Sequence, residues 1–474
     1  MSLPDYDRYD GLGLAKLVAD KKVKPVELLD EALARLERLN PKLNAVIALF
    51  AERARTQAKG RLKGPFAGVP FLLKDIQGNL AGVPTRQGSR FLPEAPAHAS
   101  DALTERFMAA GLVPFGKTNV PEFGLLPSTE GRLYGPARNP WNLDHSAGGS
   151  SGGAGAAVAA GIVPLAHAND GGGSIRIPAS ACGLVGLKPT RGRITMAPML
   201  GDLMNGLVAE LVVSRSVRDT AAILDAVQGP APGDPYFAAP PEKPYLDAIR
   251  SKPRALKIAF SASLQNGQPL HPETIKAVKK AAKLCQSLGH HVTEASPAFD
   301  FGTLTQAFMA VWASGLAMMI DGTAMLTGAK PGPDNLEGLT LGLYEQGKRV
   351  TAAQYLMAVF MLQQASRSVA AFHETHDVWL TPTLGAPPLK LGTIDTGETN
   401  PEKAFAPIIS YVPFTAIQNA TGQPAISLPL HWSAEGLPVG VQFVGRYGDE
   451  TTLLKLAAQL EKAQPWFDKR PPVR

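Results

Sequence analysis

Glycine is concentrated in one segment of this chain, between Ala147 and Ser174. Nine of these 28 residues are glycine. The segment contains two similar runs, Gly148-Gly-Ser-Ser-Gly-Gly and Gly171-Gly-Gly-Ser. Because glycine has no Cβ, such runs permit tight turns and a close backbone approach that other residues do not allow. Serine is the only reactive side chain in either run, so the segment is the first place to look for a functional site.

Three functions are typical of a glycine-rich segment. A phosphate-binding loop of the Walker type needs a lysine directly after its glycines, and no lysine follows either run. A dinucleotide-binding fingerprint needs a third glycine after Gly153 and Gly155, and Val158 stands in that place. A structural role in turns stays an alternative for each run taken alone. The third function is nucleophilic catalysis by a serine, with consecutive backbone N–H groups turned toward a developing oxyanion.

A catalytic serine needs a base, and the sequence offers two kinds. His145 and His167 are close by in sequence but belong to no recognisable Ser/His/Asp motif, and Gly-x-Ser-x-Gly is absent around Ser174. Lys74 follows an apolar run of six residues. Burial there would lower the pKa of this lysine from its ordinary value of about 10.4 and make it a base. The structural alternative is an ion pair between Lys74 and its neighbour Asp75.

Several linked motifs resemble those of the amidase signature family. Residues 68–75 resemble its lysine motif, residues 148–153 its central serine motif and residues 170–178 its nucleophile motif. Further matching segments are Gly116-Lys-Thr-Asn, Asn139-Pro-Trp-Asn, Cys182-Gly-Leu-Val-Gly-Leu-Lys-Pro-Thr and Gly422-Gln-Pro-Ala-Ile-Ser-Leu-Pro. The motifs occur in order, so the resemblance covers nearly the whole chain.

The resemblance implies a role for each motif residue. Ser174 would be the nucleophile, and Ser150, after a cis peptide bond, would pass its proton on to Lys74, the final base. The spacings agree with the family, since Ser150 follows Lys74 by 76 residues and Ser174 follows Ser150 by 24. The backbone N–H groups expected to bind the oxyanion are those of Gly171, Gly172, Gly173 and Ser174. The residues expected to support the site by hydrogen bonds are Ser151, Asp170 and Arg176.

Substrate preference is less constrained by the motifs. Gly171 departs from the family, where Ile or Thr is common, and we expect this to widen the space beside the nucleophile. Four other segments carry a closer likeness to the branch of the family that hydrolyses the cyclic dimer of 6-aminohexanoate: residues 64–70, 166–170, 177–180 and 189–194. The candidate pocket residues are Leu125, Ser128, Met309 and Trp312. Filling of the core is the alternative role for the methionine-rich stretch that contains the last two.

Hydrophobic periodicity predicts an α/β protein. Helical patterns cover residues 11–40, 101–110 and 272–288, and strands are expected directly after the last two. The proline-rich residues 228–255 are expected to form a long loop. The resemblance implies a single α/β domain with a large mixed sheet sandwiched between helices. Its expected parts are N-terminal helices at about 10–60, a catalytic core at about 61–228 and a variable helical region at about 300–370.

The function that these observations predict is metal-independent hydrolysis of a carboxylic amide through a serine acyl-enzyme. The substrate would be the 6-aminohexanoate cyclic dimer or a related linear or cyclic amide. We expect neither a metal nor another cofactor. His373 and His376 lie at i, i+3, without the i, i+4 spacing and third ligand of a typical zinc site. The alternatives are an A-type amidotransferase component that acts on charged tRNA and a non-catalytic scaffold on the same fold.

Composition restricts partners and location. The excess of 47 Lys and Arg over 41 Asp and Glu gives only +6, and no Lys/Arg-rich block occurs, so no nucleic-acid partner is expected. Two cysteines and no visible secretory signal indicate a reducing, cytoplasmic location. We count no stretch of about 18 uncharged apolar residues and expect no membrane span. A monomer or homo-oligomer is expected, with a homodimer favoured.

Overall fold

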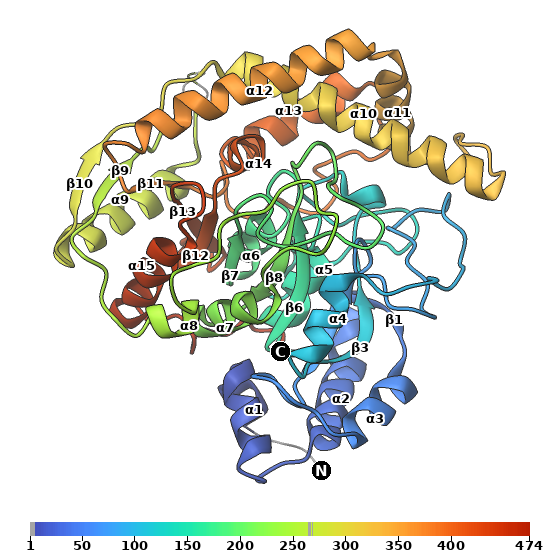
Figure 1. Ribbon diagram of the computed structural model, residues 1–474, viewed down its shortest axis with the longest axis vertical. Helices are drawn as coiled ribbons and strands as arrows, with labels where there is room; N and C mark the ends of the chain where they lie inside the picture. Colours follow the sequence, from blue (N-terminus) through green and yellow to red (C-terminus); the bar gives the residue numbers. More distant parts are fainter. Residues whose placement is uncertain (1–4, 264–266, 268) are drawn as a thin grey trace.

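An eight-stranded mixed sheet forms the centre of the computed structural model, which describes residues 5–263, 267 and 269–474 (Figure 1). The strand order is β10-β9-β11-β13-β12-β7-β8-β6. The first three strands are parallel, and every later neighbouring pair is antiparallel. The strands are β6 Leu165–Asp170, β7 Val185–Lys188, β8 Ala209–Ser214, β9 Lys257–Phe260, β10 His291–Glu294, β11 Val378–Pro382, β12 Ala425–Trp432 and β13 Pro438–Val444.

A three-stranded sheet in the order β1-β3-β2 lies beside the central sheet and carries Lys74. Strand β2 pairs in parallel with β3 and lies close to β6. The strands of the two smaller sheets are β1 Val46–Leu49, β2 Pro70–Lys74, β3 Val113–Thr118, β4 Arg138–Asn139 and β5 Asn142–Ser146. Because every residue of β2 and β6 is buried, both strands place their ends inside the molecule.

Helices enclose the central sheet. α5 and α6 pack against each other and against β6, β7, β12 and β13, whereas α7 and α15 contact each other and β7, β8 and β12. These and the N-terminal and linking helices are α1 Gly11–Ala19, α2 Pro25–Leu43, α3 Ala51–Lys59, α4 Ala102–Ala109, α5 Gly152–Ala159, α6 Arg176–Cys182, α7 Val217–Val227, α8 Tyr245–Ala248, α9 Pro272–Ser287 and α15 Glu450–Ala463. The predicted α/β architecture with a large mixed sheet between helices is confirmed.

The remaining helices form a layer at the end of the molecule opposite α1–α3 (Figure 1). They are α10 Phe301–Thr327, α11 Gly338–Arg349, α12 Ala352–Phe372, α13 Pro401–Tyr411 and α14 Ala416–Thr421. A hydrophobic cluster distinct from the main core joins α10–α13 to residues 123–126 and 203–207. This layer therefore closes over one edge of the catalytic motifs.

Helix α10 corrects the count of apolar stretches made from the sequence. It is long and apolar enough by composition to cross a membrane, although 56% of the most apolar window is buried inside the protein. Residues 301–320 contain no charged side chain. Long helices in a protein core share these properties, and α10 packs against α11 and α12.

Most predicted elements have their counterparts in the structure. α4 followed by β3 and α9 followed by β10 agree with the expected helix-to-strand passages. Residues 11–40 are not one helix, because the chain breaks between α1 and α2, where Lys21 has a positive φ of 58°. Pro25 begins α2, as expected from its fixed φ. Residues 228–255 form the expected long loop, with only the four-residue α8 within it.

Candidate active site

Lys74 is the last residue of β2 and is completely buried. Its Nζ lies 2.8 Å from Ser150 Oγ, within hydrogen-bond distance, and also donates to Asn169 Oδ1. Burial lowers its pKa from 10.5 to about 7, against the raising effects of Glu210 and Asp170. A large fraction of Lys74 is therefore neutral near pH 7 and able to accept a proton.

The alternative ion pair of Lys74 with Asp75 is wrong. Adjacent strand residues point to opposite faces, and Asp75 turns away from the lysine. Its carboxylate accepts hydrogen bonds from the backbone N–H groups of Arg86, at 3.1 Å, and Gly88, at 3.4 Å. The cation with the largest effect on the pKa of Asp75 is Lys117. Lys74 is thus left to the two serine motifs.

Ser150 stands directly before α5, after a cis peptide bond from Gly149. A Cβ atom at position 149 would lie 2.6 Å from the carbonyl oxygens of Leu126 and Ser128, so this position admits only glycine. Ser151, also buried, donates from its Oγ to the Asn169 carbonyl at 3.4 Å. These contacts fix the serine motif against the end of β6.

The loop between β6 and α6 presents Ser174 together with a row of backbone donors. Within the described part of the chain, none of the backbone N–H groups of residues 171–174 has a hydrogen-bond acceptor. Gly173 has φ 134°, and a Cβ there would lie 2.4 Å from Thr415 Oγ1. The same hydroxyl donates to the Gly172 carbonyl at 2.6 Å. The loop thus turns its carbonyl toward Thr415 and leaves its N–H groups free to bind an oxyanion.

Asp170 and Arg176 form a buried pair beneath this loop. Arg176 donates to both carboxylate oxygens of Asp170, at 2.9 and 2.8 Å, and its guanidinium also reaches α14 and β13. Asp170 in turn accepts from the Ile175 N–H at 3.2 Å. Burial alone would raise the pKa of Asp170, but the Arg176 charge holds that pKa below its usual value. The pair shapes the loop and supplies no exposed charge to the site.

Neither candidate histidine faces the serines. His167 accepts the backbone N–H of Lys74 on Nδ1 at 3.2 Å, and its Nε2 lies 2.7 Å from Glu210 Oε2. Burial lowers the pKa of His167 and raises that of Glu210, both strongly. His145 lies on β5 and forms a bridge to Lys390. Lysine is therefore the base that the geometry offers to Ser150.

Asn169 is a residue that the sequence analysis missed. Its Oδ1 accepts from Lys74 Nζ, and its Nδ2 donates to the Ile76 carbonyl at 3.3 Å. A signal was present in the sequence, because His167 and Asn169 alternate along an otherwise apolar strand and so share one face. Two polar side chains on one face of a buried strand indicate a polar partner, which here is Lys74.

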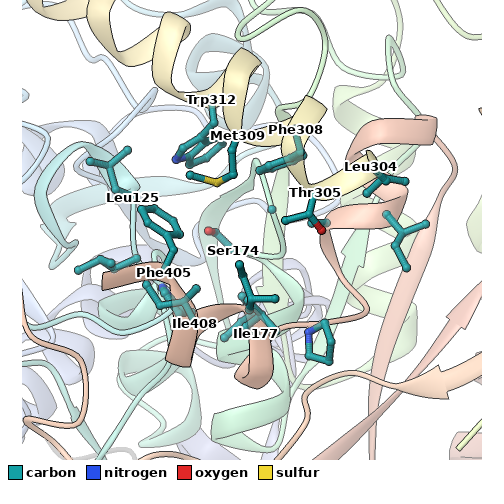
Figure 2. A pocket seen from close by; sticks show the side chains of 18 of the residues that line it. Leu125, Ser174, Ile177, Leu304, Thr305, Phe308, Met309, Trp312, Phe405 and Ile408 are labelled. Carbon is teal, nitrogen blue, oxygen red and sulfur yellow. The ribbon is translucent and has the colours of Figure 1, made fainter. Parts of the chain in front are cut away.

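An apolar cavity opens beside Ser174, between α10, α13 and the segment 124–127 (Figure 2). Leu125, Met309 and Trp312 line it, as the sequence analysis expected. Ser128 does not: it is buried, and its backbone packs against Gly149. The cavity has an empty volume of about 750 Å³, open mouth included, which is ample for a small organic substrate.

Gly171 does not widen the space beside the nucleophile, which corrects the expectation from the sequence. A Cβ at this position would lie 2.8 Å from Cζ3 of Trp312, so the indole ring fills the space that glycine leaves. Phe308 stacks on the same indole, with ring centroids 5.5 Å apart. The wall on this side of the site is therefore built by α10.

No group of three or more His, Cys, Asp and Glu residues that could hold a metal ion is found in residues 5–263, 267 and 269–474. Cys182 is buried and free, and burial raises the pKa of its thiol. Its Sγ donates to the Ala147 carbonyl at 3.3 Å, a packing role rather than a nucleophilic one. The reactive groups in the cavity are the two serines and the lysine.

Comparison with known proteins agrees with this chemistry. The Amidase family profile matches residues 27–454. The chain is 38% identical to the 6-aminohexanoate-cyclic-dimer hydrolase of Pseudomonas sp. strain NK87, over 98% of this chain and 96% of that protein. A solved structure of 6-aminohexanoate cyclic dimer hydrolase superposes with a TM-score of 0.94 at 36% identity, covering 98% of this chain and 99% of the other.

A more distant solved structure is the A-type component of glutamyl-tRNA(Gln) amidotransferase from Thermotoga maritima. It shares 26% identity, with a TM-score of 0.77 and coverage of 98% of this chain and 97% of the other. The amidotransferase is thus a distant neighbour beside the cyclic-dimer hydrolases. The family profile, the full-length relatives and the fold agree: the chain belongs to the amidase signature family and hydrolyses the C–N bond of carboxylic amides.

Proposed function

We propose that Ser174 is the nucleophile of this amidase and that Ser150 and Lys74 move its proton. The observation that carries the proposal is the 2.8 Å contact between Lys74 Nζ and Ser150 Oγ, because it pairs a buried base with a serine. Ser150 and Ser174 line the same small cavity, so the second serine lies within the same reaction space. A serine without a nearby base is a weak nucleophile, and this arrangement supplies one.

Acylation begins with neutral Lys74. The lysine takes the proton of Ser150, which takes that of Ser174 as Ser174 Oγ attacks the substrate carbonyl carbon. The negative charge that forms on the carbonyl oxygen is stabilised by the free N–H groups of residues 171–174, and loss of one such donor typically costs about 2.7–4 kcal/mol. Ser151, Asp170 and Arg176 support the geometry without contacting the substrate.

Collapse of the tetrahedral intermediate expels the amine. Protonated Lys74 returns its proton through Ser150 to the leaving nitrogen, which leaves the acyl group on Ser174. A water molecule then attacks the ester carbonyl, with the same two residues accepting its proton. Ser174 departs with that proton, and the free carboxylic acid and the starting protonation states result.

The proposed substrate is the 6-aminohexanoate cyclic dimer or a related linear or cyclic amide. The cyclic dimer is the substrate named for the relatives with 38% identity, and the cavity beside Ser174 is lined by apolar side chains. An amidotransferase role is less well supported, because that relative is at 26% identity. A non-catalytic scaffold would have no use for a buried lysine held against a serine.

Three further points remain proposals. The chain divides into N-terminal helices at about 10–60, a catalytic core at about 61–228 and a variable region at about 300–370 that shapes specificity. The lining of the cavity by α10 supports this role for the variable region. The enzyme acts as a monomer or homo-oligomer, with a homodimer favoured, and it is cytoplasmic, which two free cysteines support. Light scattering of the purified protein tests the oligomeric state.

The test of the mechanism is Ser174→Ala, assayed against a panel of cyclic and linear aminohexanoate oligomers, anilides, esters and carbamates. We expect no hydrolysis above background and no labelling by a fluorophosphonate, with an unchanged circular dichroism spectrum. Ser287→Ala, at the exposed end of α9, is the matched control and should keep both activity and labelling. Near-normal turnover by folded Ser174→Ala would show that another group is the nucleophile.

A further inference from the structure

Ser174 stands between two cavities of different chemistry. The larger one, already described, extends toward α10 and α13, and the smaller one extends toward residues 76–87 and 203–208. Their empty volumes are about 750 and 400 Å³, open mouths included. Ser174 and Trp312 line both, so a substrate that places its carbonyl at Ser174 extends one end into each cavity.

The larger cavity has no charged side chain in its lining. The labelled side chains in Figure 2 that surround Ser174 are mainly apolar, and Thr305 is the polar exception. Transfer of a charged group from water into such surroundings without a partner is costly, whereas an alkyl or aryl group gains by burial. This cavity therefore receives the apolar end of the substrate.

Trp312 separates the two cavities. Its indole occupies the place that a side chain at position 171 would take and is held from behind by Phe308. The indole is buried, with 8% of its surface exposed. Gly171 lies at the mouth of the smaller cavity, beside Ser150 and Asn169. The wall between the cavities is thus a rigid aromatic ring, which keeps the two ends of a substrate apart.

Two glutamines give the smaller cavity its polarity. Gln77 and Gln87 both line it, and both have positive φ, 53° and 49°. Such angles are uncommon for residues other than glycine and cost free energy. The fold maintains Gln87 by two backbone hydrogen bonds, from its N–H to the Asp75 carbonyl at 3.0 Å and from the Phe123 N–H to its carbonyl at 2.8 Å.

The side-chain amides of both glutamines are free. In the described residues neither one donates or accepts a hydrogen bond. A primary amide offers two N–H donors and a carbonyl acceptor, which suits another amide better than it suits an alkyl group or a single charge. Like the mechanism above, this assignment needs a substrate carbonyl at Ser174.

We propose that the enzyme selects uncharged amides that carry a second neutral hydrogen-bonding group, such as a second amide, bound by Gln77 and Gln87 in the smaller cavity while the apolar end lies against Trp312. The proposal rests on Ser174 as the nucleophile and adds a recognition site for the part of the substrate that does not react. Any diamide with its second amide a short chain away from the scissile bond meets this requirement.

The test uses N-alkyl amides in matched sets, with the distal end of one chain as a primary carboxamide or as an isosteric alkyl group. Because the cavities do not fix which side of the scissile bond faces the glutamines, one set varies the acyl chain and the other the amine chain. In one of the two sets, we expect the carboxamide to raise kcat/KM about tenfold, the effect of one or two neutral hydrogen bonds. A charged ammonium at the opposite, apolar end should lower kcat/KM at least about 100-fold.

Gln77→Met and Gln87→Met are the decisive variants, because methionine keeps the length of the side chain and removes its amide. Each should reduce or remove the carboxamide preference and leave kcat/KM for the alkyl-ended substrate within about threefold. A preference that survives both substitutions, or that is absent in both substrate sets, overturns the proposal. Hydrolysis of the alkyl-ended substrate by wild type but not by Ser174→Ala shows that the proposed function still holds in that case.

Discussion

Replacing Lys74 by methionine is expected to abolish hydrolysis and to stabilise the protein at neutral pH. Burial lowers the pKa of Lys74 from 10.5 to about 7. One pKa unit corresponds to about 1.4 kcal/mol, so burial of this lysine costs the native state roughly 5 kcal/mol at pH 7 and below. The loss of its hydrogen bonds to Ser150 and Asn169 costs about 1–3 kcal/mol for each partner left unpaired. The expected net gain is between zero and roughly 3 kcal/mol.

The pH dependence of that gain follows from the sign of the shift. The unfolded chain keeps the Lys74 proton up to pH 10.5, and the native state releases it above about pH 7. Between these values the unfolded state binds more protons, so the cost of burying Lys74 falls as the pH rises, by about 1.4 kcal/mol per unit. The advantage of the variant is therefore greatest at pH 7 and below and disappears toward pH 10.5. All other titrating groups are common to both proteins and cancel in the difference.

Urea denaturation at pH 7, 8 and 9, followed by far-UV circular dichroism, measures this difference in the free energy of unfolding. Lys279→Met, on the exposed side of α9, is the matched control and should give a difference that does not change with pH. If the difference between Lys74→Met and wild type were constant from pH 7 to 9, Lys74 would have an ordinary pKa and would not be the base. A loss of more than about 3 kcal/mol at pH 7 would also refute the reasoning.

Three other predictions follow from the site. The kcat/KM of the wild type should rise about tenfold per pH unit below pH 7 and level off above pH 8, because Lys74 must be neutral, and His145→Gln should leave this profile unchanged. Dialysis against EDTA should leave the rate unchanged; a loss that zinc restores would contradict a lysine base. Gly171→Ala should lower kcat/KM by at least about tenfold, because its Cβ would displace Trp312, and adding Trp312→Leu should restore most of it, whereas additive losses would mean that the two residues are not coupled.

The motifs predicted the reaction centre well because they consist of residues with a fixed chemical task. Lys74, Ser150 and Ser174 are separated by 76 and 24 residues, and nothing but the fold brings Lys74 into contact with Ser150. The long helical and strand patterns were equally informative, since burial of one face imposes a period on the sequence. The break between α1 and α2 was missed because both helices continue the same apolar pattern.

What the sequence did not reveal depends on contacts between distant segments. Trp312 fills the space at Gly171 across 141 positions, so the consequence of the small residue was assigned in the wrong direction. Ser128 was placed in the pocket from its position between motifs, but the chain turns its backbone toward Gly149. Asn169 and the two glutamines at positive φ have no motif of their own, and only the structure brings them to the site.

The Lys74→Met variant also separates the two duties proposed for the lysine. As a base it is needed to activate Ser174 against any substrate, so its loss should slow amide and ester hydrolysis alike at the acylation step. As an acid it is needed only where the leaving group cannot depart unprotonated, which is the case for an amine and much less so for a phenoxide or alkoxide. An additional loss of about 10²–10⁴-fold is therefore expected for the amide, the usual range of general acid catalysis. The comparison uses one acyl group with matched amine and alcohol leaving groups, read as kcat/KM. Equal losses for both substrates would mean that Lys74 acts only as a base, and a proton donor for the amine would then have to be sought elsewhere in the cavity. Ser150→Ala should show the same bias toward esters, because the proposed path from Lys74 to the amine passes through Ser150 Oγ, 2.8 Å from the lysine nitrogen.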